Sequence, residues 1–306
     1  MEKLSDNPEK DSFLSNLFFD KEQRVRALWR ILFFTATYAL LIILLAGITF
    51  LIPGNSPNTD FRILLFVNGT LSTVSAVLAG WITGRLCEGL PFNALGINFN
   101  KSTFTSFSAG FLYGILAYIA AALIAVAFGN LEFTSDAGTR AGSILQSWAF
   151  AAMLLSAPAA FEEVLFRGYI LQTFVRNQRS VFGVIFSSVL FAAVHSFNPN
   201  VSQIALANTF LAGVWFATAY LVTKNLWLPF GIHLAWNWTQ IAVFGSEISG
   251  FSRLVPISLF NENDGGPDWL TGGNYGIEGG LACTIVISIT IAINVALVYR
   301  KGKSPQ

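Results

Sequence analysis

The chain has 306 residues, of which 54% are hydrophobic and only 11% are charged, and its formal net charge is +1. Soluble domains carry roughly 25% charged residues, so this composition excludes an ordinary soluble protein. A near-neutral charge without a Lys/Arg-rich block also excludes nucleic acid as a partner. Apolar runs of about 20 residues instead predict an all-α, polytopic helix bundle surrounded by a lipid bilayer.

Eight such runs predict about eight transmembrane helices, in chain order at 31–52, 63–84, 104–128, 146–173, 181–197, 202–223, 226–245 and 281–299. With eight spans, 14 of the 18 Lys and Arg residues fall on one side of the membrane, three fall on the other side, and Arg167 lies inside it. Because basic loops stay in the cytoplasm, we expect both termini there. The expected location is the inner membrane of a bacterium, or the endoplasmic reticulum membrane in a eukaryote.

The predicted organisation is one bundle with two cytoplasmic tails. Residues 1–27 form the first tail, residues 28–300 form the bundle, and residues 301–306 form the second tail. The apolar residues at 13–19, followed by the charged stretch up to residue 30, either form a short amphipathic helix on the membrane surface or belong to a disordered tail. Nothing in the sequence indicates an oligomeric state.

The longest loop, 246–280, is predicted on the non-cytoplasmic side of the membrane. It carries many glycines, one base and five acids, which are Glu247, Glu262, Asp264, Asp268 and Glu278. Two interpretations stay open. Loop statistics favour a flexible, solvated connection, and the alternative is a lid over a site.

Very few ionisable side chains lie within the apolar stretches. They are Glu162, Glu163 and Arg167 in the fourth stretch, His195 in the fifth and His233 in the seventh. An ionisable group inside a membrane costs several kcal/mol unless it is paired or faces water, so each of these residues marks a candidate functional site. Both histidines of the chain are among them.

The spacing within the fourth stretch separates two carboxylates. Glu163 and Arg167 are four residues apart, so they share a helical face and can form an ion pair. Glu162 lies about 100° further round the helix and can face elsewhere. One carboxylate is therefore predicted to be structural, and the other is available for chemistry.

The same spacing recurs around the two histidines. Phe191 lies four residues before His195 and can pack beside its ring, while His233 shares a face with Asn237. If the three helices converge, they bring a carboxylate, two imidazoles and an amide into one cavity of low dielectric constant. The carboxylate can act as a general base on a water while an imidazole shares the proton. A histidine and an asparagine one turn apart can donate two hydrogen bonds to an oxyanion.

These residues form three motifs in order on separate apolar helices, Glu162-Glu163-x-x-x-Arg167, Phe191-x-x-x-His195 and His233-x-x-x-Asn237. They resemble the EExxxR, FxxxH and HxxxN motifs of the CPBP family. That family comprises the type II CAAX prenyl endopeptidases and bacterial membrane proteases once grouped as abortive-infection or bacteriocin-processing proteins. The resemblance covers about residues 145–240, and the stretch at 87–97 is similar to a loop that these proteins carry.

The resemblance implies an eight-helix intramembrane endopeptidase. It also implies that Glu162 and His195 activate the water, and that His233 and Asn237 hold the oxyanion. The supporting residues would be Glu163, Arg167 and Phe191. The expected substrate is a membrane-associated peptide or protein, and a CAAX peptide, a signal peptide and a leader peptide are all compatible with the motifs. No cofactor is expected.

Two alternatives remain on the same residues. In the first, zinc is held by Glu162, His195 and His233, since two histidines and a glutamate match the ligand count of a catalytic zinc. The chain lacks H-E-x-x-H, and Asn237 is a poor zinc ligand. In the second, the protein is a non-hydrolytic immunity or scaffold protein that keeps the fold.

The predicted spans place the motif residues at different depths. Counting 1.5 Å per residue from the basic ends of the spans, Glu162 and His195 lie past the membrane midplane, whereas His233 lies short of it. Residues that meet at one water need a common depth, so at least one helix must be tilted, broken or displaced. Pro229 and Gly231 are the predicted positions of a break.

Overall fold

The structure, a computed structural model, describes residues 13–20, 24–50, 60–135, 141–252 and 254–303. Helices dominate it, which confirms the predicted helix bundle. Its long helices are α2 (Ala27–Phe50), α3 (Phe61–Glu88), α4 (Lys101–Gly129), α5 (Ala141–Glu163), α7 (Ser180–His195), α8 (Gln203–Thr223), α9 (Trp227–Trp238) and α11 (Leu281–Lys303). The shorter helices are α1 (Phe13–Phe18), α6 (Gln172–Arg176) and α10 (Asp268–Thr271).

Several helical turns are irregular. Two are π-helical, at Val164–Leu171 and Thr239–Val243. Three are 3₁₀-helical, at Phe92–Leu95, Gly273–Tyr275 and Ile277–Gly279. Helix α1 covers only the apolar part of the predicted amphipathic helix, and residues 1–12 and 21–23 of the predicted tail lie outside the described residues.

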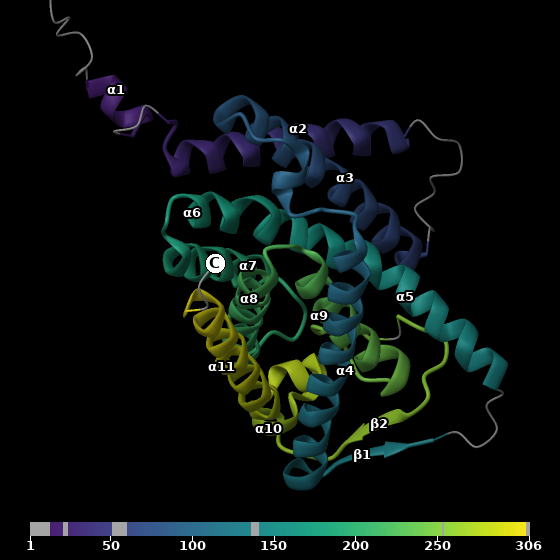
Figure 1. The fold of residues 1–306 in the computed structure, drawn as a ribbon. Helices are drawn as coiled ribbons and strands as arrows, with labels where there is room; N and C mark the ends of the chain where they lie inside the picture. Colours follow the sequence, from purple (N-terminus) through teal and green to yellow (C-terminus); the bar gives the residue numbers. More distant parts are fainter. Residues whose placement is uncertain (1–12, 21–23, 51–59, 136–140, 253, 304–306) are drawn as a thin grey trace, which may run out of the picture.

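A small antiparallel ribbon was not predicted. Strand β1 (Leu131–Thr134) follows α4 and pairs with β2 (Asn261–Asp264) from the long loop, with Leu131 opposite Asp264 and Thr134 opposite Asn261. The ribbon therefore ties the loop to the end of α4. It lies with α10 at the end of the molecule opposite α6 (Figure 1).

Each predicted span coincides with a helix, but not every helix is long enough to cross a membrane. Among the described residues, six helices are long and apolar enough, and they are α2, α3, α4, the continuous helix from Ala141 to Arg176, α8 and α11. Helix α7 is apolar but shorter, and α9 has only 12 residues before its π-helical turn. The count of eight spans and the cytoplasmic termini stay predictions.

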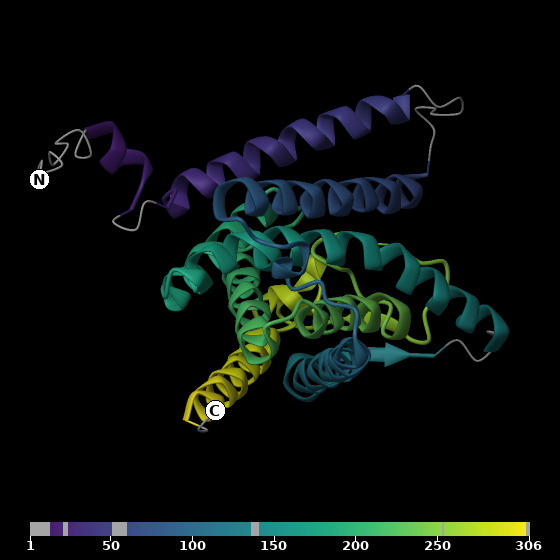
Figure 2. The same cartoon turned by 45° about the horizontal axis from the view of Figure 1, so that its top comes forward.

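Helix α9 lies at the centre of the bundle, in contact with α4, α5 and α8. Helices α2 and α3 lie side by side along one flank, next to the long helix formed by α5 and α6 (Figure 2). Helices α7 and α11 pack against α8. The helices that carry the three motifs are therefore neighbours in space.

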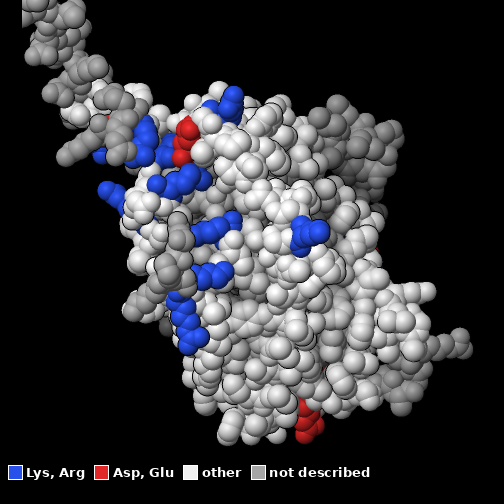
Figure 3. Space-filling model, viewed as in Figure 1, with Lys and Arg blue, Asp and Glu red and all other residues white. Residues whose placement is uncertain are grey.

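The outer surface of the bundle is largely apolar. Large side chains exposed on it include Leu40 and Ile43 on α2, Leu112 and Leu123 on α4, Phe182 and Ile185 on α7, and Ile285 and Ile289 on α11. Exposed apolar area on this scale is typical of contact with lipid. Basic side chains gather at the end of the molecule formed by α1, α6 and the C-terminal end of α11, whereas the lower part of the same face shows almost none (Figure 3).

Glycines allow α4 and α9 to pack very closely. A Cβ added at Gly231 would lie 2.5 Å from the main-chain oxygen of Phe107, and one added at Gly114 would lie 2.5 Å from that of Ile232. Such small-residue contacts let membrane helices approach backbone to backbone. The predicted break at Pro229 and Gly231 is wrong, because α9 is continuous there. The irregularities are instead the π-helical turns that follow Glu163 and Trp238.

The loop 246–280 is folded against the bundle. Its side chains Ile248, Leu254, Tyr275 and Ile277 are buried. The interpretation of this loop as a solvated connection is therefore wrong for the described residues. It covers one end of the cavity described below.

Candidate active site

Glu162 and Glu163 are the last residues of α5, and the π-helical turn that follows carries Arg167. Nη1 of Arg167 donates a hydrogen bond to Oε1 of Glu163 at 3.1 Å. Both side chains are buried, with 0% and 1% of their surface exposed. The predicted ion pair is confirmed. Single π-helical turns occur frequently at functional sites.

Arg167 also connects three helices. Its Nη2 donates to the main-chain oxygen of Gly213 on α8 at 3.1 Å. The guanidinium carbon lies 4.7 Å from the ring centroid of Phe191 on α7 and 5.1 Å from that of Phe216 on α8. Aromatic faces attract a cation that has lost its water. With the ring of Phe166 at 5.8 Å, the buried charge is stabilised by one carboxylate, one carbonyl and three aromatic rings.

His233 on α9 is fixed by the same carboxylate. Its Nδ1 lies 2.9 Å from Oε1 of Glu163, and its ring stacks on Phe216 with centroids 4.7 Å apart. A carboxylate only accepts hydrogen bonds, so Nδ1 carries a proton and Nε2 is directed elsewhere. The spacing of the motif predicted Glu163 as the partner of Arg167 alone. In the structure, the Glu163 carboxylate contacts both Arg167 and His233.

His195 ends α7 and is held by its own helix. Its Nδ1 lies 2.8 Å from the main-chain oxygen of Phe191, and the two rings are 4.4 Å apart, as the spacing predicted. Because a carbonyl oxygen only accepts, Nδ1 carries the proton and Nε2 of the neutral ring keeps a lone pair. Both histidines thus direct Nε2 away from their supporting partners.

The two Nε2 atoms meet at Glu162. Oε2 of Glu162 lies 3.9 Å from Nε2 of His195 and 3.6 Å from Nε2 of His233. These distances exceed those of hydrogen bonds and suit a bridging water. Oε2 has no hydrogen-bond partner among the described residues. Buried acceptors are normally hydrogen-bonded, so this oxygen is expected to bind a water or a ligand group from outside the chain.

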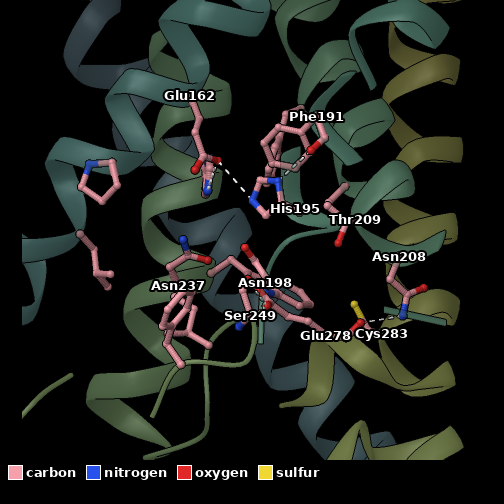
Figure 4. Close-up of a pocket in the computed structure, with 18 of the residues that line it drawn as sticks. Glu162, Phe191, His195, Asn198, Asn208, Thr209, Asn237, Ser249, Glu278 and Cys283 are labelled. Carbon is pink, nitrogen blue, oxygen red and sulfur yellow. Dashed lines mark hydrogen bonds and ion pairs between the residues drawn. The ribbon is translucent and has the colours of Figure 1, made fainter. Parts of the chain in front are cut away.

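These groups line one cavity of about 190 Å³. Asn237, one turn after His233, lines it too, and Figure 4 shows its amide on the same side as Glu162. Among the described residues, the Asn237 side chain has no recorded hydrogen bond, so its amide is available. The predicted catalytic residues therefore come together in the structure. The rest of the lining is mostly apolar and includes Leu65, Leu155, Trp215, Phe251 and Ile287.

Several residues at this site could not be recognised from the sequence. Phe216, which stacks on His233 and faces Arg167, is one of 29 phenylalanines and belongs to none of the three motifs. Ser249 and Glu278 reach the cavity from the loop, and no pattern separates Glu278 from the other acids there. Their position depends on how the loop folds back.

The donor atoms at this site are also of the kinds that bind a metal ion. The donor set of one carboxylate and two Nε2 atoms, with both Nδ1 atoms hydrogen-bonded, has the chemistry of a zinc site. Within the part of the chain that the structure describes, however, no group of three or more His, Cys, Asp or Glu residues is arranged to hold a metal ion.

Comparisons with known proteins point to one family. Residues 143–239 match the model of the family described as type II CAAX prenyl endopeptidase Rce1-like. The predicted resemblance is confirmed over this segment. The matched segment includes all three motifs and is similar to a family of proteases, and the apolar helices indicate a multi-pass membrane protein.

One relative extends the similarity beyond that core. The uncharacterized protein YyaK of Bacillus subtilis (strain 168) is 26% identical over 246 residues, which cover 76% of this chain and 74% of that protein. No solved structure matches the chain.

Proposed function

We propose that the protein is an intramembrane endopeptidase, which hydrolyses a peptide bond of a membrane-associated peptide or protein with a water activated by Glu162 and His195. The observation that carries this proposal is the convergence of Oε2 of Glu162 with two imidazole Nε2 atoms in one cavity. The Rce1-like match of the segment that contains them supports the same reaction class.

The tautomer of His195 defines how the water is held. A water between Oε2 of Glu162 and Nε2 of His195 donates a hydrogen bond to each, since both atoms accept. When its oxygen attacks the peptide carbonyl, the proton passes to the carboxylate or the imidazole. The same group then returns that proton to the leaving amine, as general acid–base catalysis requires.

His233 and Asn237 are placed to stabilise the oxyanion. Nε2 of His233 donates a hydrogen bond only when the ring is protonated, and the carboxylate of Glu163 on Nδ1 stabilises that imidazolium. The amide of Asn237 supplies a second, neutral donor. Two well-placed donors at a developing oxyanion contribute about 2.7–4 kcal/mol each.

A zinc-dependent version of the same protease is the alternative, because the donor set of Glu162, His195 and His233 has the right chemistry. A zinc ion there would lower the pKa of its bound water. Elemental analysis of the pure protein separates the two versions. The water-only mechanism predicts substoichiometric zinc and activity unchanged by a chelator, and one zinc per chain with loss of activity on chelation would establish the alternative.

The substrate can be found in the native membrane, which we propose to be the inner membrane of a bacterium, given the similarity to the Bacillus protein. Cells producing wild-type protein or Glu162→Gln at equal levels are compared by mass spectrometry of new peptide termini in the membrane fraction. We expect a set of termini that only the wild type generates. Identical sets would contradict the proposed hydrolysis.

A further inference from the structure

A second carboxylate faces the cavity from the side opposite the motif residues. Glu278 belongs to the 3₁₀ turn Ile277–Gly279, directly before α11. It lines the same cavity as Glu162 and His195, and Figure 4 shows these two residues at one side of the cavity and Glu278 at the other, beside Ser249. Glu278 lies outside the segment 143–239 that matches the protease family.

The Glu278 carboxylate is held in one position. Nε1 of Trp236 donates to its Oε1 at 3.0 Å, and the main-chain N–H and the hydroxyl of Ser249 donate to its Oε2 at 2.9 and 2.7 Å. The Asn208 amide donates to the main-chain oxygens of Glu278 and Gly280. Three donors on a carboxylate favour its ionised form and leave one lone-pair site, on Oε1, free for a ligand.

Among the described residues, no cation balances this carboxylate. Within the part of the chain that the structure describes, the cavity is lined by no Lys or Arg, and Glu278 forms no ion pair. Arg167 is committed to Glu163. Burial raises the pKa of Glu278, and the three hydrogen bonds oppose that shift. A charge that is oriented but unpaired in an apolar cavity fits a cation supplied from outside.

We propose that Glu278 is a substrate-binding residue that takes the basic side chain of a lysine or arginine near the cleaved bond. The inference rests on the proposed function and adds the class of substrate. The aliphatic stem of such a side chain would lie along apolar lining residues such as Trp215, Phe251 or Ile287. A substrate whose free carboxyl terminus reached Glu278 would be repelled. The site thus favours a basic residue within an apolar segment over a short C-terminal tripeptide.

The test uses a series of apolar peptides in which one residue next to the cleaved bond is lysine, its uncharged analogue norleucine, or glutamate, scanned over neighbouring positions. For wild-type protein in liposomes, we expect kcat/KM at one position to be about tenfold higher with lysine than with norleucine, and lower still with glutamate. In Glu278→Gln, this lysine-to-norleucine ratio should fall to about one. Glu278→Asp, which keeps the charge, should retain a preference.

The matched control is Asp268→Asn, which removes an exposed acid from the same loop that does not line the cavity. Its lysine-to-norleucine ratio should equal that of the wild type. A wild type that does not distinguish lysine from norleucine at any position would overturn the inference, even if Glu278→Gln does not fold. An unchanged ratio in folded Glu278→Gln would overturn it as well.

A binding measurement separates this inference from the proposed function. In the Glu162→Gln background, fluorescence anisotropy should show the lysine peptide binding about tenfold more tightly than the norleucine peptide, and Glu278→Gln should abolish that difference. Equal binding of both peptides would refute the role of Glu278. Absence of cleavage by the wild type, together with selective binding, would refute the proposed hydrolysis while supporting the basic subsite.

Discussion

Glu163 is the residue on which the site is assembled. One of its oxygens accepts from Arg167 at 3.1 Å and lies 2.9 Å from Nδ1 of His233. The residue therefore fixes a buried cation and the orientation of an imidazole at once. Removing its charge should affect the whole fold, because it leaves a buried guanidinium without its counter-ion.

We expect Glu163→Gln to destabilise the protein by about 3–5 kcal/mol, the usual cost of breaking a buried ion pair by removing one partner. Thermal unfolding in detergent measures this as a lower Tm. Asp60→Asn is the matched control, since it neutralises an ion pair with Arg62 that is exposed to solvent, where such pairs contribute little. Equal Tm shifts in the two variants would contradict the structural role of Glu163.

His233 and Asn237 are expected to act on the transition state. His233→Ala and Asn237→Ala should each lower kcat by about 10²–10³ with little change in KM, since oxyanion donors bind the charge that develops during the reaction. The double variant should lose less than the product of the two single losses. Steady-state kinetics with a peptide identified in the membrane fraction provides the measurement. A rise in KM with an unchanged kcat would instead indicate that these residues contact the substrate.

At the scale of helices, the sequence predicted the bundle and the motif geometry but not how the helices come together. Four-residue spacing was enough to place Phe191 beside His195 and Arg167 beside Glu163, because residues four apart lie on the same face of a helix. The partners of His233 come from α5 and α8, and local spacing carries no information on such contacts. The π-helical turns were also missed, since no proline or glycine pair marks them.

The close contact of α4 and α9 positions His233. We expect Gly231→Ala to destabilise the protein by about 1–3 kcal/mol, the range for overpacking, because the added Cβ would lie 2.5 Å from a main-chain oxygen of α4. Gly142→Ala in α5 is the control, since nothing lies within 4 Å of its added Cβ. Tm in detergent measures both. A Gly231→Ala protein as stable as Gly142→Ala would show that α4 and α9 are further apart.

The loop contributes a pH-dependent contact. Burial raises the pKa of Glu262 from 4.5 to about 7, its hydrogen bond from the Ser246 hydroxyl opposes the shift, and the charges of Glu247 and Asp264 add to it. An acid whose pKa is raised by folding stabilises the folded state fully below its unfolded pKa, and that contribution is lost as the pH rises through its folded pKa.

We therefore expect the wild-type Tm to fall as the pH rises from about 5 to 7.5. Glu262→Gln, which keeps a hydrogen-bonding group at the same place, should show a flatter profile over this range. Thermal unfolding at several pH values provides the comparison. Parallel profiles for the two proteins would mean that Glu262 does not titrate in the folded state within this window.

At the scale of the whole molecule, two different parts of the chain form the two walls of the cavity. The motif helices within residues 143–239 supply Glu162, His195, His233 and Asn237, and the sequence identified them all because their residue types and spacing are distinctive. The loop 246–280 and α11 supply the opposite wall. Its residues could not be predicted, because a glycine-rich loop has no periodicity and its path depends on burial against the assembled bundle.

The predicted orientation in the membrane, which stays a prediction, depends on where the basic side chains lie. Basic side chains gather at the end formed by α1, α6 and the C-terminal end of α11, far from the ribbon of β1 and β2 (Figures 1 and 3). With that end in the cytoplasm, the loop that covers the cavity lies on the other side of the membrane. We therefore expect the substrate to enter the cavity beside loop 246–280, from the non-cytoplasmic half of the bilayer.

The central claim is that Glu162 activates the water, and the most direct test is the cleavage rate of purified Glu162→Gln against the wild type. Both are reconstituted in liposomes with a peptide identified in the membrane fraction, after equal Tm values have established equal folding. Glu132→Gln, the same change at an exposed position of β1, is the control. We predict a rate at least about 100-fold lower for Glu162→Gln and an unchanged rate for Glu132→Gln. A Glu162→Gln rate within about tenfold of the wild type would contradict the mechanism.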